Sequence, residues 1–195
     1  MKTIDETAER NGFLRLLRIS EGRRYFRNRL LLKRHSVASP KVLFFLERKK
    51  GLTVVQSMVA TLGLQGFELW HDFFLQRARR HDFPDIKRRV LNELSWLTAR
   101  MHRMGFYISL DGRNVCVRSV PEEGKNNIAL LDLDHIKGSW LGKIPRRRRR
   151  RNLERLERTL RHTSGIDLSD HSLFALSYEF CFLHQHQFGE PDKRL

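Results

Sequence analysis

Residues 101–134 read MHRMGFYISLDGRNVCVRSVPEEGKNNIALLDLD, and the interpretation of the whole chain depends on this stretch. Gly105 ends a helical pattern, as glycine commonly does at a helix C-terminus. Two short apolar segments follow over 115–120 and 128–134, separated by a polar turn over 121–127. Apolar runs of this length, bounded by Gly, Pro and Asn, predict a β-hairpin. The stretch therefore predicts a helix end, a polar loop and a hairpin that finishes in acidic residues.

A long amphipathic helix is predicted immediately before Gly105. We expect Asp82 to cap it, with Pro84 in the first turn, where the missing amide hydrogen is tolerated. Its apolar residues recur at helical spacing and form one face. They are Val90, Leu94, Leu97, Met101 and Met104.

Further upstream, the sequence predicts a helix, a hairpin and a second, short helix. Ser20 is a suitable N-cap for a helix over 20–35. Segments rich in Val, Leu and Phe over 42–46 and 52–60 predict the two strands of the hairpin. Gly63 and Gly66 interrupt the pattern, and a short helix is predicted over 67–79.

Downstream, a basic run over 143–151 leads into a helix that we expect to continue to about His162. Leu153, Leu156 and Leu160 share one face of it. Glu154 with Arg158, and Glu157 with Arg161, have the spacing of helical ion pairs. The last apolar segment, 173–183, is also predicted to be helical.

Composition limits the class of protein. The chain has 195 residues, 40% of them hydrophobic, and a net charge of +16. Such a charge attracts polyanions, which could be nucleic acid, an anionic membrane face or a phosphorylated glycolipid. The polar first residues and the short apolar runs indicate neither a signal peptide nor a membrane span, so a cytoplasmic location is expected. Cys116 and Cys181 are expected to be buried free thiols.

The order of predicted elements is helix, hairpin, linker, long helix, loop, hairpin and helices. It fits an α+β fold with a small sheet-plus-helix lobe and a mainly helical lobe. We predict that residues 1–64 form the small N-terminal lobe and residues 65–195 the helical C-terminal lobe. The second lobe would include a catalytic-loop-like segment over 105–134 and a basic helix over 145–163.

The quoted stretch resembles the catalytic core of the lipopolysaccharide kinase family (Kdo/WaaP type, also called InaA-like). That family typically reads L-H-x-x-G at a helix end, then H-G-D-L-x-x-x-N-I, then a hairpin ending in I-D-x-D. The matching residues are Met101-His102-Arg103-Met104-Gly105, then Leu110, Arg113, Asn114 and Val115, then Leu131-Asp132-Leu133-Asp134. Residues 23–46 also resemble the family's R-x-E-W-x-N-L helix with the following Pro and strand. The resemblance covers about residues 20–163 and implies a truncated protein-kinase-like fold.

The resemblance also implies a phosphotransfer site. Such sites use a carboxylate to orient the attacking hydroxyl, and an Asn and an Asp to hold Mg²⁺ on the nucleotide phosphates. Asn114 and Asp132 would hold Mg²⁺ and ATP, with Asp134 beside them. Ser109 falls at the position of the catalytic Asp, and Asp111 is a possible displaced substitute.

Other parts of the nucleotide site also depart from the family pattern. Tyr25 falls where the helix glutamate is expected. No lysine lies between Gly12 and Arg24, where a strand preceding the helix was expected. No glycine-rich phosphate loop is evident. In these departures the chain resembles degenerate members described as toluene-tolerance proteins.

Each of these residues also has a purely structural interpretation. Asn114 could close a turn before a strand. Asp132 and Asp134 could be solvated acids at a strand end. His102 is expected to be a structural or surface histidine.

The arginine run is the strongest local signal of a partner. Cations are unfavourable at a helix N-terminus, so a bound anion is expected to offset the cost. A solvated helix start or an RNA-binding patch are the alternatives. The run comprises Arg146, Arg147, Arg148, Arg149, Arg150 and Arg151.

Three functions remain open at this point. The first is an ATP-dependent kinase of a lipopolysaccharide core sugar. The second is a pseudokinase of the same pathway, which the altered site favours. Its partners would be the lipopolysaccharide core or the anionic inner-membrane face, and another enzyme of core synthesis. The third is a nucleic-acid-binding protein, which is disfavoured because no recognised binding motif is present.

Overall fold

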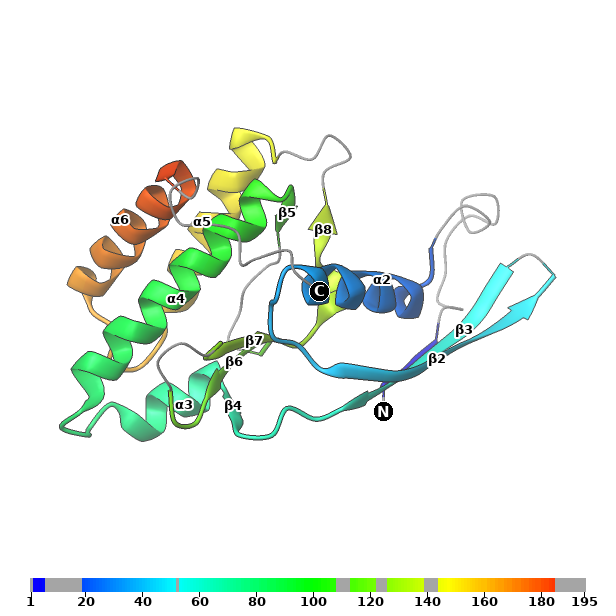
Figure 1. Cartoon of the computed structure of the whole chain (residues 1–195), viewed down its shortest axis with the longest axis horizontal. Coiled ribbons are helices and arrows are strands. Elements are labelled where there is room, and N and C mark those ends of the chain that lie inside the picture. Colours follow the sequence, from blue (N-terminus) through cyan, green and yellow to red (C-terminus); the bar gives the residue numbers. More distant parts are fainter. Residues whose placement is uncertain are drawn as a thin grey trace.

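The computed structural model describes residues 19–51, 53–107, 113–121, 126–138 and 144–184, together with the backbone of residues 2–5. Figure 1 shows a smaller lobe of strands and one helix beside a mainly helical lobe, in agreement with the predicted α+β arrangement. The smaller lobe contains β1 (Lys2–Asp5), α2 (Glu21–Arg34), β2 (Lys41–Lys50) and β3 (Thr53–Leu62). The remaining elements are β4 (Phe67–Leu69), α3 (Trp70–Arg77), α4 (Phe83–Arg103), β5 (Phe106–Tyr107), β6 (Val115–Arg118), β7 (Ile128–Leu130), the 3₁₀ turn η1 (Leu133–His135), β8 (Lys137–Gly138), α5 (Arg146–Arg161) and α6 (Leu168–His184).

The small lobe is an antiparallel sheet in the order β1-β3-β2. The β2–β3 hairpin confirms the prediction. Strand β2 is longer than expected at both ends, whereas β3 begins one residue later and ends two residues later than predicted. The strand β1 was not predicted, because its composition is polar. It pairs with β3, with Lys2 opposite Val59 in the register. Most of the lysine-free stretch between Gly12 and Arg24 lies outside the described residues.

Helix α2 packs against this sheet, and its first turn lies very close to it. Ser20 caps the helix as predicted, since its Oγ accepts a hydrogen bond from the amide of Arg23 at 3.0 Å. The Ser20 hydroxyl also donates to the carboxylate of Glu47 on β2. A Cβ at Gly22 would lie 2.8 Å from Phe45 and 2.8 Å from Ser57, so only glycine fits between helix and sheet.

The helical lobe is organised around α4. Its predicted apolar face is buried, with Val90 fully excluded from solvent and Leu94 and Met101 each 1% exposed. Gly105 follows the helix with φ of +82°, a conformation that favours glycine. Asp82 occupies the N-cap position, but its carboxylate binds Arg80 at 3.0 Å and does not cap the helix.

A second sheet, in the order β4-β6-β7, lies against the helical lobe. The prediction of a helix over 67–79 was wrong at its start, because Phe67–Leu69 form a strand that pairs with Cys116–Arg118. The predicted strand over 128–134 was too long: β7 ends at Leu130 and the 3₁₀ turn η1 follows. The hairpin itself is confirmed by the β6–β7 pairing.

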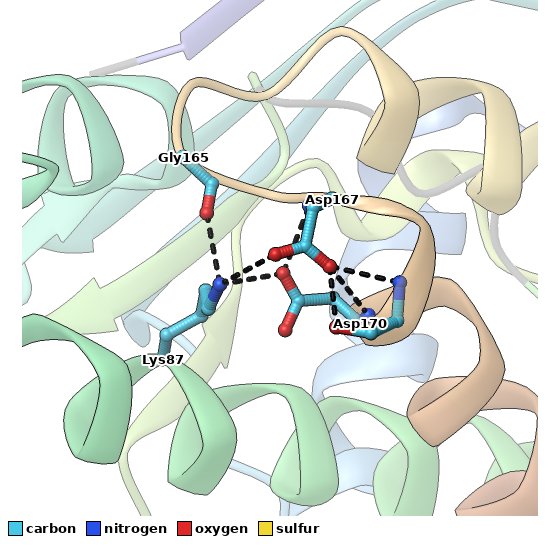
Figure 2. Close-up of polar contacts among 5 residues, drawn as sticks. Lys87, Gly165, Asp167 and Asp170 are labelled. Atoms are coloured by element: carbon cyan, nitrogen blue, oxygen red, sulfur yellow. Dashed lines mark hydrogen bonds and ion pairs between the residues drawn. The ribbon is translucent and has the colours of Figure 1, made fainter.

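Polar contacts of Lys87 join α4 to the start of α6 and to the loop before it (Figure 2). Lys87 Nζ lies 2.6 Å from the carboxylate of Asp170 and donates to the carbonyl of Gly165 at 3.1 Å. Asp167 caps α6 by accepting from the amides of Ser169 and Asp170. The hydroxyl of Ser169 also donates to this carboxylate, and this bond first, followed by that of the Asp170 amide, lowers the pKa of Asp167 to about 2.

The predictions for the last two helices hold with small corrections. The arginine run is itself the start of α5, which begins at Arg146. Glu157 pairs with Arg161 as expected, but Glu154 pairs with Arg150 at 3.1 Å and not with Arg158.

Cys116 is buried as predicted, whereas Cys181 is half-buried. Among the residues that the structure describes, no helix is long and apolar enough to cross a membrane. The lobe boundary between residues 64 and 65 stays a prediction.

Candidate functional site

The β6–β7 hairpin places Asn114 and Asp132 at one end of the same two strands. Val115 is opposite Leu130 in the register, and the amide of Leu131 donates to the carbonyl of Asn114 at 2.9 Å. Asn114 is 4% exposed, and Asp132 is half-buried at the N-cap of η1. The two residues that sequence resemblance assigned to Mg²⁺ are therefore close in space, although 18 positions apart in the chain.

Tyr25 of α2 lies near Asp132 and Asp134, in the electrostatic field of both. Burial first, and then the negative charges of Asp132 and Asp134, raise the pKa of Tyr25 to about 12. The phenol is thus protonated and uncharged at neutral pH. Asp134 is itself 5% exposed, with its carboxylate 3.7 Å from the ring of His135. Tyr25 stands where the family pattern has a glutamate, and here it adds no negative charge to the two acids.

Asn28 fixes α2 to the segment that carries these acids. Its side-chain amide donates to the carbonyls of Leu133 at 2.6 Å and Ile136 at 3.2 Å. Leu133 is fully buried between the two lobes. Sequence reasoning did not single out Asn28, although it corresponds to the Asn of the R-x-E-W-x-N-L pattern, which was the available signal.

The oxygen donors present suit a hard cation. Mg²⁺ binds through one or two carboxylates together with phosphate oxygens, without an all-protein cage. The Asp132 carboxylate and the Asn114 side-chain carbonyl fit this requirement. Within the described ranges, no group of three His, Cys, Asp or Glu side chains is assembled for a metal ion. Ser109 and Asp111 lie at 108–112, outside the described residues.

His102, part of the resemblance motif, is a structural residue. The hydroxyl of Tyr178 donates to its Nδ1 at 2.8 Å, and its Nε2 donates to the side-chain oxygen of Asn152 at 2.8 Å. These bonds join α4, α5 and α6. Burial lowers the pKa of His102 to about 4. The hydrogen bond with Asn152 opposes this shift, and the positive charge of the nearby Arg149 adds to it. The ring is therefore neutral at pH 7, which fits a ring that accepts from Tyr178 and donates to Asn152.

The arginine run lies at the N-terminus of α5, where five of the six side chains are exposed and Arg149 is half-buried. Pro145 is the N-cap and offers no side-chain hydrogen bond, and the first turn contains no acid. The helix end therefore combines uncapped amides with cationic side chains, which is unfavourable unless anions are near.

Comparison with known proteins shows a family match and a likeness to solved structures. Residues 10–178 match the lipopolysaccharide kinase (Kdo/WaaP) family. A solved structure described as WaaP in complex with acyl carrier protein is similar with a TM-score of 0.65 and 18% sequence identity. The likeness covers 81% of this chain and 66% of that chain, so this chain spans about two-thirds of the length of that protein. A comparison with curated protein sequences gives no match. The structural likeness confirms the predicted kinase-like fold.

Proposed function

Because the chain belongs to the lipopolysaccharide kinase (Kdo/WaaP) family, we propose that it acts in modification of the lipopolysaccharide inner core as a pseudokinase. In this proposal the kinase-like fold binds its partners, and phosphotransfer is strongly impaired. The family match covers most of the chain, which supports the pathway. The altered residues support the loss of turnover.

The proposal depends chiefly on Tyr25. In protein kinases, a glutamate on the corresponding helix pairs with the lysine that holds the nucleotide phosphates. The buried, protonated phenol of Tyr25 has no charge with which to hold a lysine. Ser109 would in addition replace the carboxylate that orients the acceptor hydroxyl. General-base groups contribute about 10²–10⁴-fold to rate, so two defects together would leave little turnover.

ATP and Mg²⁺ are the cofactors used by the family, and we propose residual binding by Asn114, Asp132 and Asp134. Mg²⁺ at this position would neutralise charge on the nucleotide phosphates. Asn114 and Asp132 would supply the oxygen ligands, and the hairpin register, which places their backbones near each other, supports this proposal.

A titration with Mg²⁺ and ATP, followed by thermal shift and calorimetry, tests the binding. We expect weak saturable binding that is lost in Asp132→Ala, while Asp85→Ala, a change of an acid exposed on α4, has no effect. A phosphotransfer assay on purified lipopolysaccharide core should give little or no product for the natural chain. Ser109→Asp should not restore it, because Tyr25 remains. Robust turnover by the unmodified protein would overturn the pseudokinase proposal.

The second candidate is an active lipopolysaccharide core kinase. The closeness of Asn114 and Asp132 favours it, because these are the two Mg²⁺ positions of the family. In this case turnover should be lost in Asp111→Asn, which would identify Asp111 as a displaced base. Turnover that is unaffected by changes at both Asp111 and Asp132 would mean that the site has been wrongly assigned.

For location, we propose the cytoplasmic face of the inner membrane, with Arg146–Arg151 on phosphates of the lipopolysaccharide core or of the anionic leaflet. Each basic residue near an anionic membrane surface contributes about 1 kcal/mol of attraction. Binding should be strong at about 0.1 M salt and weaken as the screening length shortens. Glutamine at all six positions should abolish it. A protein partner from the same pathway is a further proposal, since the similar WaaP structure contains acyl carrier protein.

A further inference from the structure

We propose that the outer face of α6 enters an anionic lipid bilayer, with the arginines of α5 holding the surrounding headgroups. The inference rests on the proposed anionic partner of α5 and extends it from electrostatic attraction to insertion. The surface is defined by Leu176, Phe180 and Leu183 of α6 and by the N-terminal half of α5.

Helix α6 is apolar on both sides, which is unusual for a helix at the surface of a protein. Its inner face is buried through Phe174 and Tyr178, which are 5% and 1% exposed. On the outer face Leu176, Phe180 and Leu183 are 72%, 52% and 65% exposed. Their spacing of four and three residues places them in one row along the helix. The outer face thus exposes three apolar side chains to solvent, with Phe180 in contact with the ring of His184 and the exposed Glu179 beside the row.

A groove lies beside this row, between α6 and α4. Its volume is about 590 Å³, and Trp96 of α4 lines it opposite Leu176 and Phe180. The guanidinium of Arg100 lies 5.3 Å from the centre of the Trp96 ring. Tryptophan is enriched at the boundary between headgroups and acyl chains.

Basic residues contact the C-terminal half of α6 at Phe182, which stacks on Tyr178 of the inner face. The guanidinium of Arg149 lies 4.1 Å over the ring of Phe182, and Arg103 donates to the carbonyl of Phe182 at 3.1 Å. Figure 1 shows the start of α5 and the end of α6 at the same end of the helical lobe. Cationic and apolar side chains therefore lie next to each other at this end.

Charge selects the bilayer among possible occupants of this surface. A second copy of the chain would bring another net charge of +16 against the first, which opposes self-association. An apolar helical face bordered by Lys or Arg is the combination that binds at the interface of anionic membranes. Attraction to headgroups and burial of apolar side chains would then act together.

Co-sedimentation with vesicles tests the insertion. Vesicles of phosphatidylcholine, with and without phosphatidylglycerol, would be compared at about 0.1 M and about 1 M salt, where the screening length falls from about 10 Å to 3 Å. We expect binding only with phosphatidylglycerol, and a fraction that persists at the higher salt. The triple change Leu176→Ser, Phe180→Ser and Leu183→Ser should remove that fraction and weaken binding about tenfold or more, because affinity scales with buried apolar area.

Leu43→Ser is the matched control, because Leu43 is 55% exposed on β2 in the other lobe. It should bind like the natural chain. Quenching of fluorescence by brominated lipid should also fall in Trp96→Phe. The inference is overturned if the triple variant binds as the natural chain does at both salts. It is equally overturned if the natural chain does not co-sediment with any of the vesicles and instead binds an acidic protein.

These assays contain neither nucleotide nor lipopolysaccharide. A failure of the pseudokinase proposal would leave their result unchanged. Loss of binding in the variant with six glutamines, without any effect of the α6 changes, would retain the arginine proposal and reject insertion.

Discussion

At the scale of single residues, Asn28 is the contact that holds α2 against the acids of the hairpin. Its amide bonds two carbonyls, of Leu133 and Ile136, that lie on either side of Asp134 in the chain. Removing a donor from partly buried acceptors costs about 1–3 kcal/mol. Asn28→Ala should therefore lower the free energy of unfolding by that amount in urea denaturation. Asn126→Ala removes an exposed amide–carbonyl bond to Ser36 and should cost less than about 0.5 kcal/mol. Equal losses of stability from Asn28→Ala and Asn126→Ala would contradict the role of Asn28 in holding α2 in place.

His102 makes stability depend on pH, and the sign follows from its lowered pKa. The pKa falls from 6.5 in the unfolded chain to about 4 in the native protein. Between these values the unfolded state binds more protons, so the free energy of unfolding declines as pH falls, with a slope of up to about 1.4 kcal/mol per pH unit. Urea unfolding at several pH values should show that the free energy of unfolding depends less steeply on pH in His102→Gln. The exposed His71→Gln is the control and should keep the natural slope.

At the scale of elements, Lys87 joins the middle of the helical lobe to its last helix. Its side chain is 13% exposed and that of Asp170 is 8% exposed, so this ion pair is largely removed from water. Lys87→Met should reduce the free energy of unfolding by about 1–3 kcal/mol, between the values typical of surface and buried pairs. Arg88→Met breaks a pair with Asp85 whose side chains are 67% and 84% exposed. Thermal unfolding should therefore show a much smaller loss of stability for Arg88→Met than for Lys87→Met. A larger loss for Arg88→Met would contradict the role of Lys87.

The elements that sequence predicts well are those with a local pattern. The apolar row of α4 and the hairpin of β2 and β3 follow from periodicity within each segment. By contrast, β4 was mistaken for helix because its strand character comes from pairing with Cys116–Arg118, far along the chain. Strand β1 was missed because its composition is polar and because its strand character comes from pairing with Gln56–Val59 of β3. At the site, resemblance indicated Asn114 and Asp132, but the bonds of Asn28 depend on how the two lobes meet and are invisible in a local window.

At the scale of the whole molecule, the charge of +16 opposes compactness. Because Arg146, Arg147 and Arg148 occupy the first turn of α5, each also interacts unfavourably with the helix dipole, by about 0.3–1 kcal/mol. Replacing these three with glutamine should therefore keep or raise the melting temperature. The melting temperature of the natural chain should rise when salt increases from about 0.05 to 0.3 M, because salt screens the repulsion between its positive charges. The melting temperature of the variant should rise less, because it has fewer positive charges to screen. A variant that melts markedly lower would show that the arginines are needed for folding and not for a partner.

The close seating of α2 has a consequence for regulation. In many kinases, activity is controlled by the position of the corresponding helix. Here a glycine-sized gap holds the first turn at Gly22, and the amide of Asn28 holds a later turn. A helix fastened at both places cannot swing outward without losing the contact of its glycine with the sheet and both amide bonds. A regulator of this protein would therefore have to act by binding to its surface, because displacement of α2 would break these contacts.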